Sequence, residues 1–302
     1  MRRSILIVLF SCCLAAEASA QACRDIATYE GSVRVRQTAD GIVTFRANVD
    51  VNTDGALQSY RADDLGFIDP KIKRLNTRSA LNTICNGVNI RNSRNGLVFN
   101  FRSCTALIRE FQRIRDFGWH RAGENYVEFY AIAGVPGTTR PGRNRYTPCE
   151  RDGFYVSHTA RAIDPKKGVC DPDRWVDALR ISAIVLPLDA AMKRTGIALH
   201  DLAIVRLPGT QTWIGAIVGD TNPSKIGEGT VILAMRLRGQ TAIPGNYRQT
   251  LALALPAAEY FVFPRTASLI PNLSNASDVD IQKQAKLLYD KHKLAERTRL
   301  CP

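Results

Sequence analysis

The chain has 302 residues and a formal net charge of +13 at pH 7, with 45% hydrophobic and 23% charged residues. These values are typical of a folded globular protein and exclude a disordered chain, a collagen-like repeat and a multi-span membrane protein. A chain of this length can bury a sizeable core, as one elaborated domain or as two small ones.

The N-terminus is typical of a signal peptide. Arg2 and Arg3 precede an apolar run that is too short to span a bilayer of about 30 Å, and the small residues at 18–20 offer a cleavage site. We therefore predict that residues 1–20 are removed and that the mature protein, residues 21–302, is secreted or periplasmic.

Six of the eight cysteines remain in the mature chain. An even number of cysteines in an exported protein predicts up to three disulfide bonds, although the sequence leaves their pairing open. No Cys-x-x-Cys is present and the histidines lack the spacing of metal ligands, so we predict no metal and no cofactor. The six are Cys23, Cys85, Cys104, Cys149, Cys170 and Cys301.

In the first half, strict alternation of apolar and polar residues predicts a half-buried strand from Ile42 to Val51, whose polar face carries Asp50. Helical spacing of apolar residues predicts one helix over 105–117. Acidic residues dominate positions 50–69 and basic residues dominate 71–109. Each run is typical of a solvated surface, but together they also suit an acidic neighbourhood set into a basic body.

After about Pro172, short apolar runs recur with Pro, Gly or Asn-Pro between them. This spacing predicts five or six short strands that form a small closed barrel. Asp189 is a candidate cap for a short helix that ends near Gly196. The basic amphipathic segment 278–300 predicts a helix that docks on the domain, with binding to an anionic membrane surface as the alternative. The predicted strands are 183–186, 203–207, 213–218, 231–235 and 260–263.

The segment 213–231 carries the most informative polar residues. A central apolar strand ends at Asp220, the turn signal Asn222-Pro223-Ser224 follows, and a further strand is predicted to start near Thr230. If the chain doubles back here, Asp220 and Glu228 approach to roughly 5 to 9 Å, the range in which paired carboxylates cleave glycosidic bonds. The alternative is an Asx turn at Asp220 and a surface position for Glu228.

Several of these motifs resemble glycoside hydrolase family 75, the chitosanase-like proteins. The resemblance covers about 48–66 and 153–263, and its most specific pieces are Gly219-Asp220-Thr221 and Ile226-Gly227-Glu228. Other matching pieces are Asp50-Val-Asn-Thr-Asp54-Gly55-Ala56, Gly153-Phe-Tyr-Val-Ser157, Trp175-Val-Asp177-Ala, Ala183-Ile-Val-Leu-Pro187 and Asp201-Leu-Ala-Ile-Val205.

The resemblance implies a mainly β protein with added helices (α+β), built on a six-stranded double-psi-like β-barrel. It also implies inverting endo-hydrolysis of a β-1,4-linked, glucosamine-containing polysaccharide such as chitosan. Asp220 and Glu228 would be the catalytic pair. The candidates for substrate binding are Asp50, Asp54, Asp201, Thr221 and Trp213.

We predict a monomer with one elaborated catalytic domain, a helical insert over about 71–145, no nucleic-acid partner and no integral membrane segment. Chitosan is a polycation, which a basic body repels unless a local acidic groove dominates within about 10 Å. Asp63 and Asp64 would join Asp50, Asp54 and the catalytic pair in such a groove. The alternatives are a peptidoglycan-active enzyme and a non-catalytic protein that binds envelope glycans.

Overall fold

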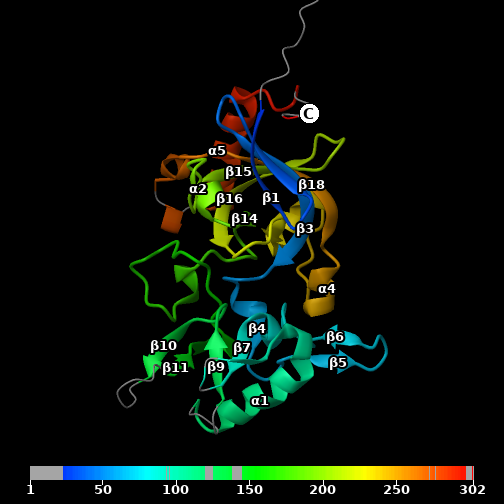
Figure 1. The fold of residues 1–302 in the computed structure, drawn as a ribbon, viewed down its shortest axis with the longest axis vertical. Coiled ribbons are helices and arrows are strands. Elements are labelled where there is room, and N and C mark those ends of the chain that lie inside the picture. The colour runs from blue at the N-terminus through cyan, green and yellow to red at the C-terminus, as the bar shows by residue number, and fades with distance from the viewer. Residues whose placement is uncertain are drawn as a thin grey trace, which may run out of the picture.

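The computed structural model describes residues 23–92, 94, 96–119, 125–137, 145–271, 273–275, 277–296 and 301. The predicted signal peptide lies outside these residues. Figure 1 shows two parts, one above the other: a β-barrel above, and below it a group of short strands with one long helix. We call the lower part, residues 60–155, the insert lobe.

Six strands close into the barrel, because β18 pairs with β15 on one side and with β3 on the other. Two further strands, β1 (Cys23–Tyr29) and β2 (Val33–Thr38), extend the sheet beside β3. The closed barrel predicted from the strand spacing is therefore present. In order around it lie β3 (Val43–Asn52), β17 (Glu228–Thr230), β14 (Ala183–Leu186), β16 (Trp213–Thr221), β15 (Leu202–Arg206) and β18 (Leu255–Val262).

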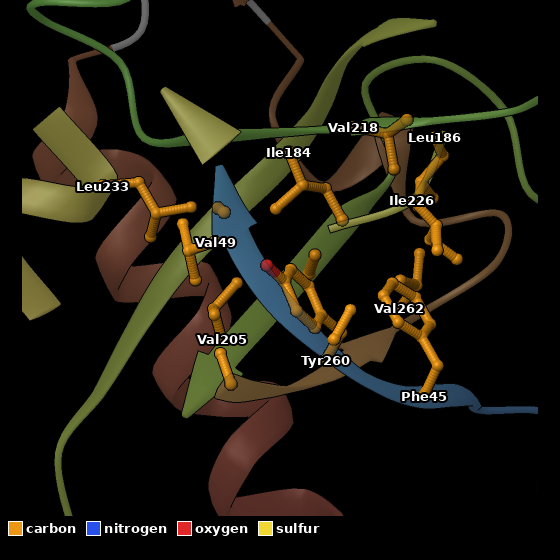
Figure 2. Packing of buried hydrophobic residues seen from close by; sticks show 14 of the residues in the cluster. Phe45, Val49, Ile184, Leu186, Val205, Val218, Ile226, Leu233, Tyr260 and Val262 are labelled. Atoms are coloured by element: carbon orange, nitrogen blue, oxygen red, sulfur yellow. The ribbon is translucent and has the colours of Figure 1, made fainter. Parts of the chain in front are cut away.

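The barrel interior is filled by the inward residues of these strands. On β3 the predicted alternation is confirmed: Val43, Phe45, Ala47 and Val49 are buried, and the residues between them are more exposed. Phe45 stacks on Tyr260 of β18 with the ring centroids 4.5 Å apart, and Figure 2 shows the two side chains among the aliphatic residues of the core. Burial of this apolar surface is the main stabilising contribution to the barrel.

The insert lobe has its own buried core, centred on Phe111 of its helix. It contains one α-helix and ten short strands among the described residues, and is therefore more β-rich than the predicted helical insert. The difference has a local cause, since Val88 and Ile90 alternate with polar residues at the two-residue period of a strand. The elements are β4 (Tyr60–Arg61), β5 (Phe67–Asp69), β6 (Arg74–Asn76), β7 (Val88–Arg91), β8 (Leu97–Phe99), α1 (Cys104–Asp116), β9 (Tyr126–Phe129), β10 (Gly134–Gly137), β11 (Arg145–Pro148), β12 (Glu150–Arg151) and β13 (Phe154–Tyr155).

Four helices accompany the barrel strands: α2 (Ala190–Lys193), α3 (Val231–Leu237), α4 (Tyr247–Leu251) and α5 (Asp278–Lys291). The predicted strand at 231–235 was wrong, because this run forms α3. An apolar run without polar alternation fits a buried helix as well as a buried strand, and most of α3 is buried.

The C-terminal helix docks on the barrel, as expected for a helix with one apolar face. Ile281 and Ala285 of α5 are fully buried, and Gln282 exchanges hydrogen bonds with the backbone of Gly215 on β16. The α5 helix ends at Lys291, before the predicted end near residue 300. Of this remaining stretch, residues 297–300 lie outside the described residues.

The six cysteines that follow the predicted signal peptide form three disulfide bonds: Cys23–Cys301, Cys85–Cys104 and Cys149–Cys170. Three intramolecular disulfides are typical of extracellular proteins. In the described part of the chain, no helix combines the length and apolar character needed to span a membrane.

Candidate active site

Four residues lie in one row across the outer face of the barrel. Val185 of β14 pairs with Asp220 of β16 on one side and with Glu228 of β17 on the other, and Glu228 pairs in turn with Asp50 of β3. Two strand spacings separate Asp220 from Glu228, which places their backbones about 9.5 Å apart. The chain therefore brings both carboxylates to one face, with an apolar residue between them.

The strands β16 and β17 are not a hairpin. The loop between them crosses β14, which is inserted between the two strands in the sheet. Ile226 anchors this loop because its side chain is fully buried in the barrel core (Figure 2). Gly227 then has φ +87°, a conformation that glycine adopts most easily, and its carbonyl accepts a hydrogen bond of 2.8 Å from the Asp50 amide.

A bulge directs Asp220 away from the barrel core. Regular alternation would place Asp220 on the same face as Val218, which packs inside the barrel. The register with β14 shifts between the Val218 and Asp220 pairs, so that Gly219 is the extra residue. Such a bulge redirects the following side chain, and Asp220 consequently lines a pocket outside the core.

The pocket has a volume of about 850 Å³, which is in the range of small-molecule sites in proteins. Asp50, Asp54, Asp220 and Glu228 all line it. The barrel strands form one wall, the insert lobe forms a second, and α4 contributes residues at the side, so the pocket lies at the junction of the two parts seen in Figure 1. Uncharged polar residues of the second wall and of α4 are Tyr60, Asn82, Asn86, Asn89, Tyr130, Tyr247 and Thr250.

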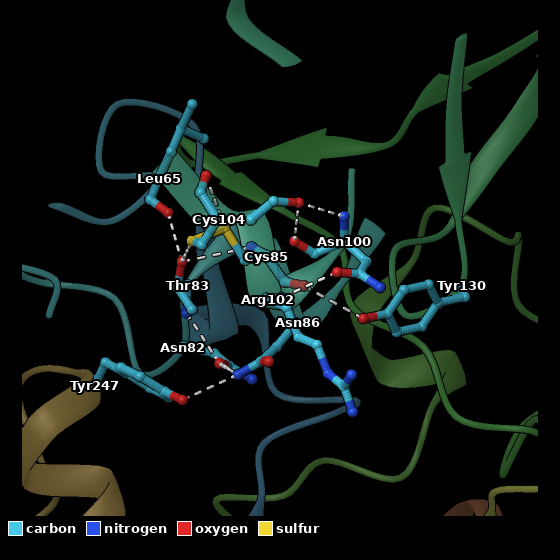
Figure 3. Close-up of a disulfide and its surroundings, with 11 residues drawn as sticks. Leu65, Asn82, Thr83, Cys85, Asn86, Asn100, Arg102, Cys104, Tyr130 and Tyr247 are labelled. Carbon is cyan, nitrogen blue, oxygen red and sulfur yellow. Dashed lines mark hydrogen bonds between the residues drawn. A yellow bond between two sulfur atoms is a disulfide. The ribbon is translucent and has the colours of Figure 1, made fainter. Parts of the chain in front are cut away.

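The wall formed by the insert lobe is stiffened by hydrogen bonds and a disulfide. Figure 3 shows Asn86 donating to Asn82 and to the Tyr247 hydroxyl, at 2.7 and 3.2 Å. The Tyr130 hydroxyl donates to the carbonyl of Cys85, which is bonded to Cys104 at the start of α1. The covalent link therefore fixes the backbone directly beside this wall.

Asp220 is held by the backbone and is easily protonated. Its Oδ1 accepts hydrogen bonds from the amides of Ala160 and Thr221, at 2.6 and 2.8 Å. The pKa of Asp220 is raised to about 6. Burial is the main cause, these two hydrogen bonds oppose the increase, and the negative charge of Glu228 adds to it. A carboxyl group with this pKa can donate a proton near neutral pH.

Glu228 has a cation and an amide as neighbours. Lys225 Nζ lies 2.8 Å from Glu228 Oε1 and 2.9 Å from Asp50 Oδ2, and Asn222 Nδ2 donates to Glu228 Oε2 at 3.2 Å. Burial lowers the pKa of Lys225, but the charge of Glu228 and the hydrogen bonds to both carboxylates raise it above its ordinary value. The ammonium group therefore remains charged while it contacts the Glu228 and Asp50 carboxyl groups.

Asp54 lies in the same pocket and has a raised pKa. Burial, together with the negative charges of Asp220 and Glu228, raises its pKa to about 8, against the opposing effect of hydrogen bonds from Tyr60 and Ser157. Tyr60 Oη donates to Asp54 Oδ1 at 2.9 Å, and the Ser157 hydroxyl donates to the same oxygen at 3.4 Å. Three carboxyl groups of this pocket therefore interact electrostatically.

The structure brings together five of the seven predicted site residues: Asp50, Asp54, Asp220, Thr221 and Glu228. Asp201 and Trp213 do not belong to the site. The Asp201 carboxylate is fully buried and accepts hydrogen bonds from the amides of a loop, including Thr266 and Ala267. Trp213, at the other end of β16, stacks on Tyr289 of α5.

The acidic groove is also smaller than predicted. Asp63 pairs with Arg61, and Asp64 accepts hydrogen bonds from the amides of Arg78 and Ser79, so neither lines the pocket. Lys225, Tyr60 and the uncharged wall were not predicted from the sequence. Only Lys225 had a signal, because it lies between the two catalytic candidates.

His158 also lines the pocket, and burial lowers its pKa. Among the described residues, no group of three or more His, Cys, Asp or Glu side chains is arranged to hold a metal ion. No known protein-family model matches the sequence, and no curated protein sequence matches it.

Proposed function

We propose that the protein is an exported glycoside hydrolase that cleaves a β-1,4-linked amino-sugar polymer, chitosan or a related polysaccharide, with inversion. The observation that carries the proposal is the row in which Asp220 and Glu228 lie on either side of Val185 and face one pocket. Inverting glycosidases use two carboxyl groups about 6.5 to 9.5 Å apart, with room for a water molecule between sugar and base.

The environments of the two carboxyl groups suit different roles. Asp220, with its pKa raised to about 6, would protonate the glycosidic oxygen as the general acid. Glu228, whose carboxyl group contacts the Lys225 ammonium, would remove a proton from the attacking water as the general base. The developing positive charge on the sugar ring would be stabilised by the ionised carboxylates.

The order of the strands supports a double-psi-like barrel as the framework. In a psi motif, a loop joins two strands of a sheet across a third strand between them, as the 222–227 loop does over β14. Asp220 and Glu228, which the resemblance to family 75 implies as the catalytic pair, lie at the two ends of this crossing loop. Secretion of the protein is consistent with its three disulfides.

The test is release of reducing ends from partially acetylated chitosan, chitin oligomers and peptidoglycan. We expect the wild-type protein to cleave at least the amino-sugar polymers, with NMR showing an α-anomer as the first product. Asp220→Asn and Glu228→Gln should each lower the rate by at least about 10³-fold. Asp290→Asn, an exposed carboxyl on α5, is the matched control and should retain full activity.

Three outcomes would contradict the proposal. Full activity in both Asp220→Asn and Glu228→Gln would reject these residues as the catalytic pair. A β-anomer as first product would reject inversion. Binding of the polymers without any release of reducing ends would identify a non-catalytic glycan-binding protein.

A further inference from the structure

The lysine of the pocket occupies a specific position. Among the described residues that line the pocket, Lys225 is the only lysine or arginine. Its ammonium group lies between Asp50 and Glu228, within 2.9 Å of an oxygen of each. These two residues are register partners on neighbouring strands, so Lys225 bridges a carboxylate pair that the sheet itself creates.

The position of Lys225 is built into the loop that carries it. The amide of Lys225 donates to Asn222 Oδ1 at 2.7 Å, and the next residue, Ile226, is fully buried in the barrel core. The side chain itself is about 39% exposed, so its tip reaches the open pocket from a fixed backbone. The backbone at Lys225 is therefore already fixed, and only the side-chain torsions must be ordered in its contact with the pair.

The bridging ammonium changes what the acidic residues can bind. Asp50 and Glu228 present two negative charges, and Lys225 compensates one of them at contact distance. A glucosamine ring carries an ammonium group, which would compete with Lys225 for the same carboxylate oxygens and be repelled by its charge. An N-acetylated ring has no charge and meets no such repulsion.

The opposite wall favours the same class of ring. Uncharged side chains linked by hydrogen bonds line it, and none offers an anionic group to an ammonium: Tyr60, Asn82, Asn86 and Tyr247. Figure 3 shows Asn82, Asn86 and Tyr247 of this set. Neutral amide and hydroxyl groups of this kind suit the hydroxyl and acetamido groups of a sugar.

We propose that Lys225 is a specificity-determining residue that makes the subsite beside Glu228 select N-acetylated, uncharged amino-sugar rings over glucosamine rings. This inference rests on the proposed function, since it concerns the substrate of the same pocket. The expected substrate is then a polysaccharide with N-acetylated sugar units at the positions that contact Asp50 and Glu228.

The experiment compares a fully acetylated with a fully deacetylated β-1,4-linked hexamer, at one pH and one ionic strength. We expect the wild type to have a higher kcat/KM on the acetylated hexamer. In Lys225→Met the ratio of the two kcat/KM values should shift toward the deacetylated hexamer by at least about tenfold, because the carboxylate pair is then free for a substrate ammonium. Lys225→Arg keeps the charge and should retain the wild-type preference.

The control is Lys286→Met, which removes an exposed lysine paired with Asp290 on α5 and should leave the ratio unchanged. An unchanged ratio in Lys225→Met, or a wild type that prefers the deacetylated hexamer, would overturn the inference.

Calorimetric binding of both hexamers to Asp220→Asn, with and without Lys225→Met, separates this inference from the proposed function. The same shift in affinity without hydrolysis by the wild type would reject the glycosidase and retain the specificity role. No shift in affinity would reject the specificity role, whether or not the wild type is an enzyme.

Discussion

Asp50 and Glu228, far apart in the sequence, are paired in register on the parallel strands β3 and β17. This pairing joins the acidic turn after β3 to the loop that carries the candidate catalytic residues. Asp54, four residues after Asp50, consequently reaches the same pocket as Asp220. The charges in the pocket are therefore coupled, and the first two predictions concern their titration.

The first prediction concerns the pH dependence of hydrolysis. If Asp220 is the general acid, kcat/KM should fall as pH rises through about 6, because the carboxyl then loses the proton that it must donate. A single group with this pKa predicts a decrease of about tenfold between pH 5 and pH 7. The measurement is kcat/KM across pH 4.5–9 with the acetylated hexamer, and unfolding at each pH serves as the control. A limb centred near 8 would instead identify Asp54 as the acid.

The second prediction concerns stability and the carboxyl of Asp54. Its pKa is about 8 in the folded protein, whereas an unfolded Asp titrates near 4. Between these values Asp54 binds more protons in the folded state, so its contribution to the free energy of unfolding falls as pH rises from about 4 to about 8. Asp54→Asn removes this loss and preserves an oxygen that accepts the Tyr60 hydrogen bond.

The measurement is the thermal midpoint of wild type, Asp54→Asn and the control Asp290→Asn at several pH values. Relative to wild type, Asp54→Asn should become progressively more stable from pH 4 to pH 8, by a few kcal/mol in total. Asp290→Asn should follow the wild-type curve. Parallel curves for wild type and Asp54→Asn would show that Asp54 is not protonated in the folded protein.

The parts of the fold that the sequence predicted are those that local patterns determine. The alternation on β3 shows its buried face, and the cap residue Asp189 marks the start of α2. The run at 231–235 was wrongly predicted as a strand because it is apolar on every side. The helix fits the residues that surround it, because Gly229 has no side chain and Leu233 can pack closely against β17.

The candidate site was only partly predictable for a related reason. The pair Asp220 and Glu228 lies in one continuous segment whose motifs suggested it. The uncharged wall depends on contacts between distant parts of the chain, such as Asn86 with Tyr247, which leave no pattern in the sequence. The sequence also does not show that Asp201 is structural. A buried aspartate that accepts hydrogen bonds from a loop and an aspartate that binds substrate look the same in a sequence.

The third prediction separates stability from the shape of the pocket. Cys85 and Cys104 are 19 residues apart, and opening this loop by Cys85→Ser with Cys104→Ser should lower the free energy of unfolding by about 3 kcal/mol. Because Cys85 lies beside Asn86 and holds Tyr130, the KM should rise as well.

The matched control is Cys23→Ser with Cys301→Ser, which opens the link between the chain ends, outside this pocket. It should lower stability, by about 5 kcal/mol on loop length alone, without raising the KM. Denaturant unfolding and steady-state kinetics measure the two effects. Equal changes in KM for both double variants would contradict a specific role of Cys85–Cys104 in the pocket wall.

The fourth prediction concerns Gly55, the residue after Asp54. Gly55 has φ +85°, and a Cβ added there would lie 1.9 Å from the backbone oxygen of Val176. Gly31, in the turn between β1 and β2, has φ +73° with nothing near the corresponding position. Gly31→Ala should therefore cost about 1 kcal/mol, from the left-handed backbone alone. Gly55→Ala adds a backbone clash and should cost more than about 3 kcal/mol.

Denaturant unfolding of the two variants measures this difference directly, and kinetics test its functional consequence. To relieve the clash, the chain must move Gly55 away from Val176, and this movement displaces Asp54 from Tyr60 and Ser157. Hydrolysis by Gly55→Ala should therefore fall even at temperatures where the variant is fully folded, whereas Gly31→Ala should retain wild-type rates. Equal costs for the two substitutions would mean that the turn after β3 moves freely, and that Asp54 is not held in the pocket by its backbone.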